Sequence, residues 1–175
     1  RKMVGRADAV VVPDLRRREQ FGGVRPRYLV EIQNVPEDRS PRTQTEDPTQ
    51  FVLFYGGMIA RDRGLIDLLA ACEATGAKLL VAGHGPDEAA LLDDIESSPA
   101  SSYLGTIPYE EVLARTASCH AVAALYDPSV PNNRFAAPNK LFEAMMCSKP
   151  VLVSDRTIAA EIVREESCGV VVPYG

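Results

Sequence analysis

The sequence predicts an α/β domain of the Rossmann-like, doubly wound type, with a six-stranded parallel sheet between two layers of helices. From residue 51 onward, short runs that are apolar on both faces alternate with helical stretches, as in parallel strands buried between helices. Several of these runs end in glycine, where a chain leaves a sheet and turns into a loop. Ligands of such sheets bind at the carboxyl ends of the strands, so the loops there are the candidate site.

The expected elements follow one another in strict alternation. FVLFYGG and KLLVAGHGP predict two strands, and GLIDLLAACEATG between them has apolar residues at helical spacing. DEAALLDDIESS predicts a helix whose early acidic residues suit the helix dipole. The later elements are a weak strand at 102–104, helix YEEVLARTAS, strand AVAALY, helix PNKLFEAMMC, strand PVLVS, helix TIAAEIVREE and strand GVVVP. Residues 126–138 are expected to be a polar loop.

The first part of the chain is organised differently. Apolar runs at 9–12 and 28–32 predict two strands, with a charged helical stretch at 16–20 between them. These elements are too few to enclose a core, so we expect residues 1–38 to be the remnant of a neighbouring domain. Residues 39–49 are polar and proline-containing and predict a linker, followed by the ligand-binding domain at 50–175.

Composition excludes several classes of function. The chain has 19 basic and 24 acidic residues and a net charge of −5, which argues against nucleic-acid binding. No apolar run approaches the roughly 18 residues of a membrane span, so no transmembrane segment is expected. The four cysteines form no Cys-x-x-Cys pair, and His84 and His120 lack ligand-spaced partners, so we expect no metal site. A cytoplasmic protein, or one peripheral at the inner face of the membrane, is the expectation.

Two glycine loops allow more than one interpretation. In GGMIARDRG, Gly57 lets a ligand approach the backbone, and Arg61 and Arg63 stand near a helix N-terminus that favours anions. Taken alone, this loop is better explained as a turn with two solvated arginines. In GHGP, residues 83–86, the glycines either admit a ligand or simply turn the chain, and His84 is expected to face solvent.

The stretch APNKLFEAMM carries the most information. Pro138 suits the first position of a helix, and no capping side chain precedes it. The amides of residues 139–141 (Asn139, Lys140 and Leu141) therefore have no obvious side-chain acceptor, and a phosphate would supply one. Lys140 and Glu143 stand one turn apart, away from the apolar face. They suit a phosphate and a ribose, or a surface ion pair worth only a few tenths of a kcal/mol, and spacing leaves both open.

Taken together, residues 51–175 resemble the donor-binding, C-terminal domain of a GT-B glycosyltransferase, most similar to the family-four enzymes. The collinear segments are YGGMIARDRGLIDLLAA, LLVAGHGPD, YLGTIPYEEV and APNKLFEAMMCSKPVLVSD. Residues 6–38, with ADAVVVPD and IQNVPED, resemble the end of the N-terminal acceptor domain and the interdomain linker. The resemblance thus implies one half of a GT-B fold.

The resemblance also implies roles for individual residues. Glu143 matches the second glutamate of the E-x7-E motif and would hold the ribose of the nucleotide. Arg63 would face the diphosphate, Ile107 would pack on the base, and the backbone of Gly57 would lie near the donor.

Two positions depart from the family pattern. Phe135 stands where the first glutamate is expected, and Met58 replaces the usual arginine after the glycine. The resemblance therefore leaves the contact with the donor sugar to Asn132, Asn133 or Arg134.

The function implied is transfer of a sugar from a nucleoside-diphosphate sugar to a glycan or lipid-linked acceptor, in polysaccharide or glycoconjugate biosynthesis. Such a hexosyltransferase-like enzyme would be retaining, need no metal or other cofactor, and take its catalytic residues from the missing N-terminal domain. The fragment alone is then expected to be inactive. Two alternatives stay open: an epimerase-like GT-B enzyme acting on a UDP-sugar, and a scaffolding domain that kept the fold and lost binding.

Overall fold

The computed structural model describes residues 3–38 and 49–175 and contains the predicted six-stranded parallel sheet. The strands lie in the order β5-β4-β3-β6-β7-β8. They are β3 (Val52–Gly56), β4 (Lys78–Ala82), β5 (Ser101–Tyr103), β6 (Ala121–Ala124), β7 (Val151–Ser154) and β8 (Gly169–Val172). This confirms the Rossmann-like fold class.

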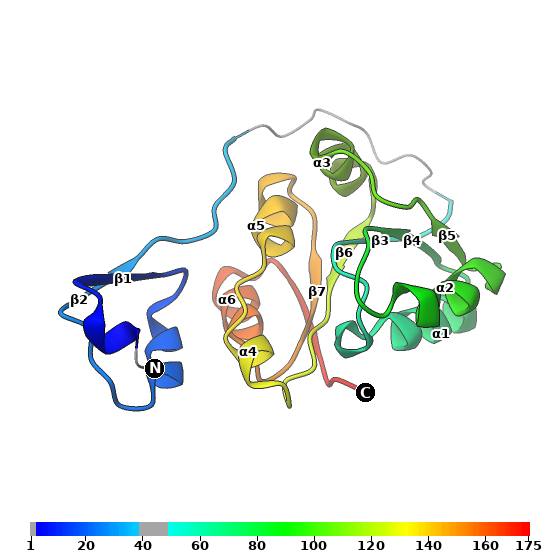
Figure 1. Ribbon diagram of the computed structural model, residues 1–175. Coiled ribbons are helices and arrows are strands. Elements are labelled where there is room, and N and C mark those ends of the chain that lie inside the picture. The colour runs from blue at the N-terminus through cyan, green and yellow to red at the C-terminus, as the bar shows by residue number, and fades with distance from the viewer. Residues whose placement is uncertain (1–2, 39–48) are drawn as a thin grey trace.

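Helices cover both faces of the sheet (Figure 1). One side carries α1 (Leu65–Thr75) and α2 (Glu88–Ser97), and the other carries α3 (Tyr109–Ser118), α5 (Asn139–Met146) and α6 (Ile158–Glu166). The chain moves outward from β3 to β5, then crosses back to β6 and moves outward in the opposite direction. Because such crossovers are right-handed, this reversal switches the helices to the other face. The switch point lies between β3 and β6.

The core consists of two layers, one on each face of the sheet. Tyr55 packs with Leu65 and Val81 on the α1 side, whereas Phe54 packs with Leu141 and Val153 on the α5 side. Successive side chains of a strand point to opposite faces, so both neighbours are buried. This explains why the strand sequences are apolar without alternation.

The N-terminal segment forms a separate two-stranded parallel sheet of β1 (Ala9–Val12) and β2 (Tyr28–Glu31). The charged stretch between the strands is a 3-10 helix, η2 (Leu15–Phe21), and η1 (Val4–Arg6) precedes β1. Val11 and Val30 remain exposed. The division into domains stays a prediction, and residues 39–48 of the predicted linker lie outside the described residues.

Local structure differs from expectation at a few places. The predicted polar loop contains a short helix, α4 (Pro131–Arg134), because Pro131 starts a helical turn. The loop after β3 contains a 3-10 turn, η3 (Arg61–Arg63). Pro138 is not the first residue of α5 but precedes it in an extended conformation, with ψ 144°. The weak strand lies one residue earlier than predicted, at Ser101–Tyr103.

None of the helices in the described part of the chain has the length and apolar character needed to cross a bilayer.

Candidate functional site

A cavity of about 350 Å³ lies at the carboxyl ends of β3 and β4, beside the switch point. Its lining consists of Gly57, Met58, Ala82, Gly83, His84, Thr106, Ile107 and Val112. The predicted base-binding residue Ile107 is thus on its wall. His84 is exposed, as expected, but it also lines the cavity, and its Nδ1 lies 3.3 Å from Thr106 Oγ1.

The glycines of the GHGP loop are explained by packing between loops. A Cβ on Gly83 would lie 1.8 Å from the carbonyl oxygen of Gly57, and one on Gly85 would lie 2.1 Å from that of Ile59. Both positions therefore exclude any side chain, with or without a ligand. Gly57 differs, since its Cβ would meet Nζ of Lys140 at 2.8 Å. That glycine lets the ammonium group lie directly against the backbone at the end of β3.

Lys140 reaches from the first turn of α5 to the end of β3. Its Nζ lies 3.8 Å from the ring centre of Tyr55 and 5.9 Å from that of Tyr126, so aromatic faces hold the ammonium group. Burial, together with the positive charge of Arg63, lowers the pKa of Lys140 to about 7, and Glu143 offsets part of this effect. An anion bound beside Lys140 would reverse that shift.

Glu143 is buried, with only 6% of its surface exposed, although its spacing placed it away from the apolar face of the helix. The reason is that α3 packs against α5 and covers this position. Burial raises the pKa of the Glu143 carboxyl, while a hydrogen bond from Tyr109 and the charge of Lys140 act in the opposite direction. The carboxylate is therefore not a surface ion-pair partner, and the Tyr109 hydroxyl occupies one of its acceptor positions.

Arg63 is held by a network that links η3 to α4. Its Nη1 lies 2.7 Å from Asp62 Oδ2 and donates to Asn133 Oδ1 at 3.2 Å, and its guanidinium lies 4.5 Å from the ring centre of Tyr126. Nδ2 of Asn133 in turn donates to Asp62 Oδ2 at 2.8 Å. Asn133 is 2% exposed, and it uses both ends of its amide to hold the η3 turn.

The remaining predicted residues lie less centrally. Asn139 and Arg134 are exposed, and the Arg134 guanidinium lies 5.8 Å from the ring centre of Phe135. Leu141 is fully buried, and its amide donates to the carbonyl of Pro138 at 3.0 Å, so it is not available to a phosphate. Arg61 is exposed, and its side chain pairs with Asp87, whose Oδ1 lies 3.8 Å from Arg61 Nε.

Three tyrosines that build the site were not predicted. The ring of Tyr55 lies against the Lys140 ammonium group, and that of Tyr126 lies against the Arg63 guanidinium. Tyr109 donates a hydrogen bond to the Glu143 carboxylate. Tyr55 also donates a hydrogen bond to the carbonyl of Met58, which fixes the loop after β3. A possible signal was the position of Tyr55 and Tyr126 at or just after the ends of strands that flank the switch point.

Within residues 3–38 and 49–175, no group of three or more metal-ligating side chains lies together. His120 has a structural role, since its Nδ1 accepts a hydrogen bond from the amide of Val52 at 3.0 Å and its ring stacks on Phe51.

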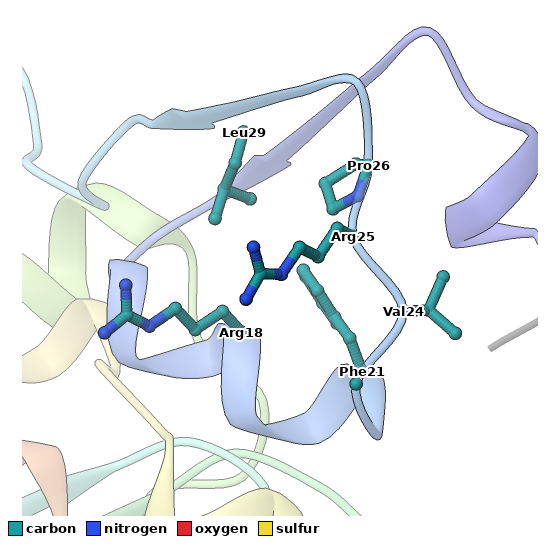
Figure 2. Close-up of a pocket in the computed structure, with 7 residues that line it drawn as sticks. Arg18, Phe21, Val24, Arg25, Pro26 and Leu29 are labelled. Carbon is teal, nitrogen blue, oxygen red and sulfur yellow. The ribbon is translucent and has the colours of Figure 1, made fainter.

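Among the further cavities, two differ clearly in their lining from the one beside the switch point. One, of about 540 Å³, lies in the N-terminal segment between Arg18, Phe21, Arg25 and Leu29 (Figure 2). The other, of about 590 Å³, is almost wholly apolar and includes Phe51 and Val170 in its lining. Neither contains any of the predicted site residues.

A doubly wound sheet with a cavity beside its switch point, next to two cations that lie against aromatic rings, is an arrangement in which α/β proteins bind ligands. Comparison with known proteins gives the family of the chain. The sequence model of the glycosyl transferases group 1 family matches residues 49–175, and the chain belongs to this family. The resemblance to a GT-B, family-four-like donor domain is thereby confirmed.

Solved structures show the same fold. HepE from Anabaena, in complex with UDP and glucose, is 17% identical with a TM-score of 0.78, and the match covers 99% of this chain and 52% of HepE. AviGT4, a glycosyltransferase involved in avilamycin A biosynthesis, is 24% identical with a TM-score of 0.70, over 94% of this chain and 50% of AviGT4. The chain thus spans about half the length of these proteins. No curated protein sequence matches it.

Proposed function

We propose that residues 49–175 bind the nucleoside diphosphate of a sugar donor, and that the complete protein transfers the sugar to an acceptor. The observation that carries this proposal is the position of Lys140, whose ammonium group lies against Gly57 at the edge of the 350 Å³ cavity. A half-buried cation beside an apolar cavity suits a ligand with one flat ring and one polyanionic end. Arg63, which shares Tyr126 with Lys140, supplies a second positive charge.

The ligand would use three parts of the site. The base would lie in the cavity against Ile107, and the diphosphate would face Lys140 and Arg63. Glu143 would accept the ribose hydroxyls after the Tyr109 side chain has moved away. HepE is described in complex with UDP-glucose, which favours uracil as the base.

The chemical role of the domain follows from these charges. As the bond between sugar and diphosphate breaks, negative charge develops on the leaving group, and fixed cations stabilise it. Binding of the diphosphate would raise the pKa of Lys140 from its value of about 7 and keep the ammonium charged. Retention of anomeric configuration, independence of metals and a role in glycoconjugate biosynthesis in the cytoplasm belong to the same proposal.

Calorimetric titration of the 175-residue chain with UDP, GDP and ADP tests the binding step. We expect UDP to bind, and Lys140→Ala and Glu143→Ala to weaken it strongly. Lys78→Ala is the matched control, because Lys78 lies at the opposite end of the strands, where its Nζ donates to the carbonyl of Ser101 at 2.8 Å.

The same titration separates the alternatives. If no nucleotide binds at millimolar concentration, and Glu143→Ala has no effect on the complete protein, the chain is a scaffolding domain. If the complete protein converts a UDP-sugar to its epimer without any acceptor, as followed by NMR, the epimerase alternative is correct.

A further inference from the structure

The helix α4 contacts two different parts of the molecule through neighbouring residues. On its outer side, Arg17 of η2 donates through Nη1 to Asn132 Oδ1 at 3.3 Å, and Gln20 donates to the carbonyl of Pro131 at 3.3 Å. On its inner side, buried Asn133 holds Arg63 and Asp62. A single helical turn therefore joins the N-terminal segment to the cation that faces the proposed diphosphate.

The N-terminal segment also holds the other end of the same stretch. Nδ2 of Asn34 donates to the carbonyl of Ala137 at 2.9 Å, just before α5 begins and three residues before Lys140. Arg16 forms an ion pair with Glu161 of α6 as well, which adds a contact outside this stretch. Residues 131–137 are thus fixed at both ends by residues of the segment 3–38.

We propose that Arg17, Gln20 and Asn34 are positioning residues for the donor site, acting through residues 131–137 on Arg63 and Lys140. The proposal rests on the proposed function, because it concerns the affinity of the same site for a diphosphate. Arg63 is held in place by Asn133, and Asn133 keeps its position only if α4 does. Releasing α4 from η2 therefore loosens the diphosphate side of the site and leaves the base cavity unchanged.

The physical basis is the short range of the contacts. Arg17 of η2 is hydrogen-bonded to Asn132. The next residue, Asn133, is hydrogen-bonded to Arg63, so two hydrogen bonds and one peptide unit connect η2 to Arg63. The hydrogen bonds with η2 are exposed to solvent, so each one alone contributes little to stability. Their effect is to restrict the position of a four-residue helix that has no side-chain cap of its own.

The test compares the double variant Arg17→Ala, Gln20→Ala and the single variant Asn34→Ala with the unchanged chain. We measure the dissociation constants of UDP and of UMP, which share the base and ribose and differ in the second phosphate. In the double variant and in Asn34→Ala we expect UDP affinity to fall three- to tenfold and UMP affinity to fall by less than twofold. Arg17→Lys, which keeps a cationic donor, should restore most of the UDP affinity when Gln20 is intact.

The control is Arg18→Ala. Arg18 is adjacent to Arg17 on η2, is exposed, and lines the cavity of Figure 2. It should leave both affinities unchanged. Equal weakening of UDP and UMP would show general destabilisation, and no weakening of either would show that α4 needs no support; each result overturns the proposal.

Hydrogen exchange of the ligand-free chain distinguishes this proposal from the proposed function. In the double variant we expect faster exchange in residues 131–137 and also in 61–63, where the Arg63 amide donates to the Ala60 carbonyl. If the unchanged chain binds no UDP, the proposed function fails, but the exchange result still decides whether η2 supports η3. Unchanged exchange at 61–63 would overturn that link.

Discussion

At the scale of single residues, Lys140 combines a functional advantage with a cost in stability. Its ammonium group lies near the rings of Tyr55 and Tyr126. Burial and the positive charge of Arg63 disfavour the charged form of Lys140. Residues held in such strained electrostatic surroundings are typical of functional sites. The structure therefore predicts effects of pH on both binding and stability.

Binding of UDP should weaken as pH rises above neutrality. The pKa of Lys140 is about 7, so the free site loses its charge above that pH, whereas the bound diphosphate favours the charged form. From pH 7 to 8.5 we expect the association constant to fall by roughly an order of magnitude. Lys140→Arg, which stays charged, should remove this dependence. An unchanged slope in that variant would assign the titration to another group.

Replacing Lys140 by methionine should stabilise the fold while impairing binding. The folded-state pKa of about 7 lies below the ordinary lysine value of 10.5, so between these pH values the unfolded chain binds more protons. Stability of the unchanged chain therefore rises with pH in this window. Lys140→Met should therefore be more stable than the unchanged chain at pH 6, and the difference should fall by about 2 to 3 kcal/mol between pH 6 and pH 9. Urea denaturation at both pH values measures this, and a gain that grows with pH would contradict it.

Tyr109→Phe should tighten UDP binding a few-fold. The Tyr109 hydroxyl donates to Glu143 in the ligand-free state and so competes with the ribose hydroxyls. The phenylalanine keeps the ring and removes the competing donor. Calorimetry with Tyr28→Phe as the control, on an exposed strand of the N-terminal segment, measures the effect. Weaker binding would instead indicate that the Tyr109 hydroxyl contacts the ligand.

At the scale of elements, the loops after β3 and β4 form one packed unit. The amide of Gly57 donates to the carbonyl of Ala82 at 2.9 Å, and the amide of Ile59 donates to that of His84 at 3.0 Å. These bonds bring the backbones so close that the second loop tolerates only glycine at 83 and 85. The site therefore depends on a rigid pair of loops.

Gly83→Ala should be strongly destabilising. Its Cβ would overlap the Gly57 carbonyl at 1.8 Å, and its φ of 129° is unfavourable for alanine. We expect a loss of about 3 kcal/mol, measured by chemical denaturation. The control is Gly76→Ala, which also has a positive φ, 73°, but has no atom within 4 Å of the new Cβ, and should cost about 1 kcal/mol. Equal losses would show that conformation and not overlap determines the cost.

The order and type of the main elements could be predicted from sequence, because apolar periodicity reports directly on burial in a parallel sheet. Side-chain placement within the site was only partly predictable. Glu143 is spaced like a surface residue on its own helix, and only the packing of α3 buries it. Asn133 was singled out as a contact of the donor sugar, which stays a prediction. Its partners in the structure, Asp62 and Arg63, lie 71 and 70 residues away, a distance that no local pattern spans.

At the scale of the whole molecule, the sheet is unevenly covered. Within the described residues, α1 and α2 lie on one face, and α3, α5 and α6 lie on the other (Figure 1). The large apolar cavity on the less covered face reaches Val170 of the edge strand β8, which is 58% exposed. An exposed apolar edge strand favours self-association.

Val170→Lys should therefore reduce concentration-dependent association of the 175-residue chain, measured by light scattering, without lowering its melting temperature. A charged side chain on an edge strand opposes pairing with a second sheet. Glu166→Lys, an exposed change near the end of α6, serves as the control for added positive charge. Equal effects of the two variants would point to net charge as the cause.

The strand order also has a consequence for synthesis on the ribosome. β3 pairs with β4 on one side and with β6 on the other, and β6 begins at Ala121, long after β3 ends at Gly56. During translation one edge of the central strand thus stays without its neighbour while some sixty-five further residues are made, since 121 − 56 = 65. The nascent half-sheet is the stage at which a chaperone has most to shield.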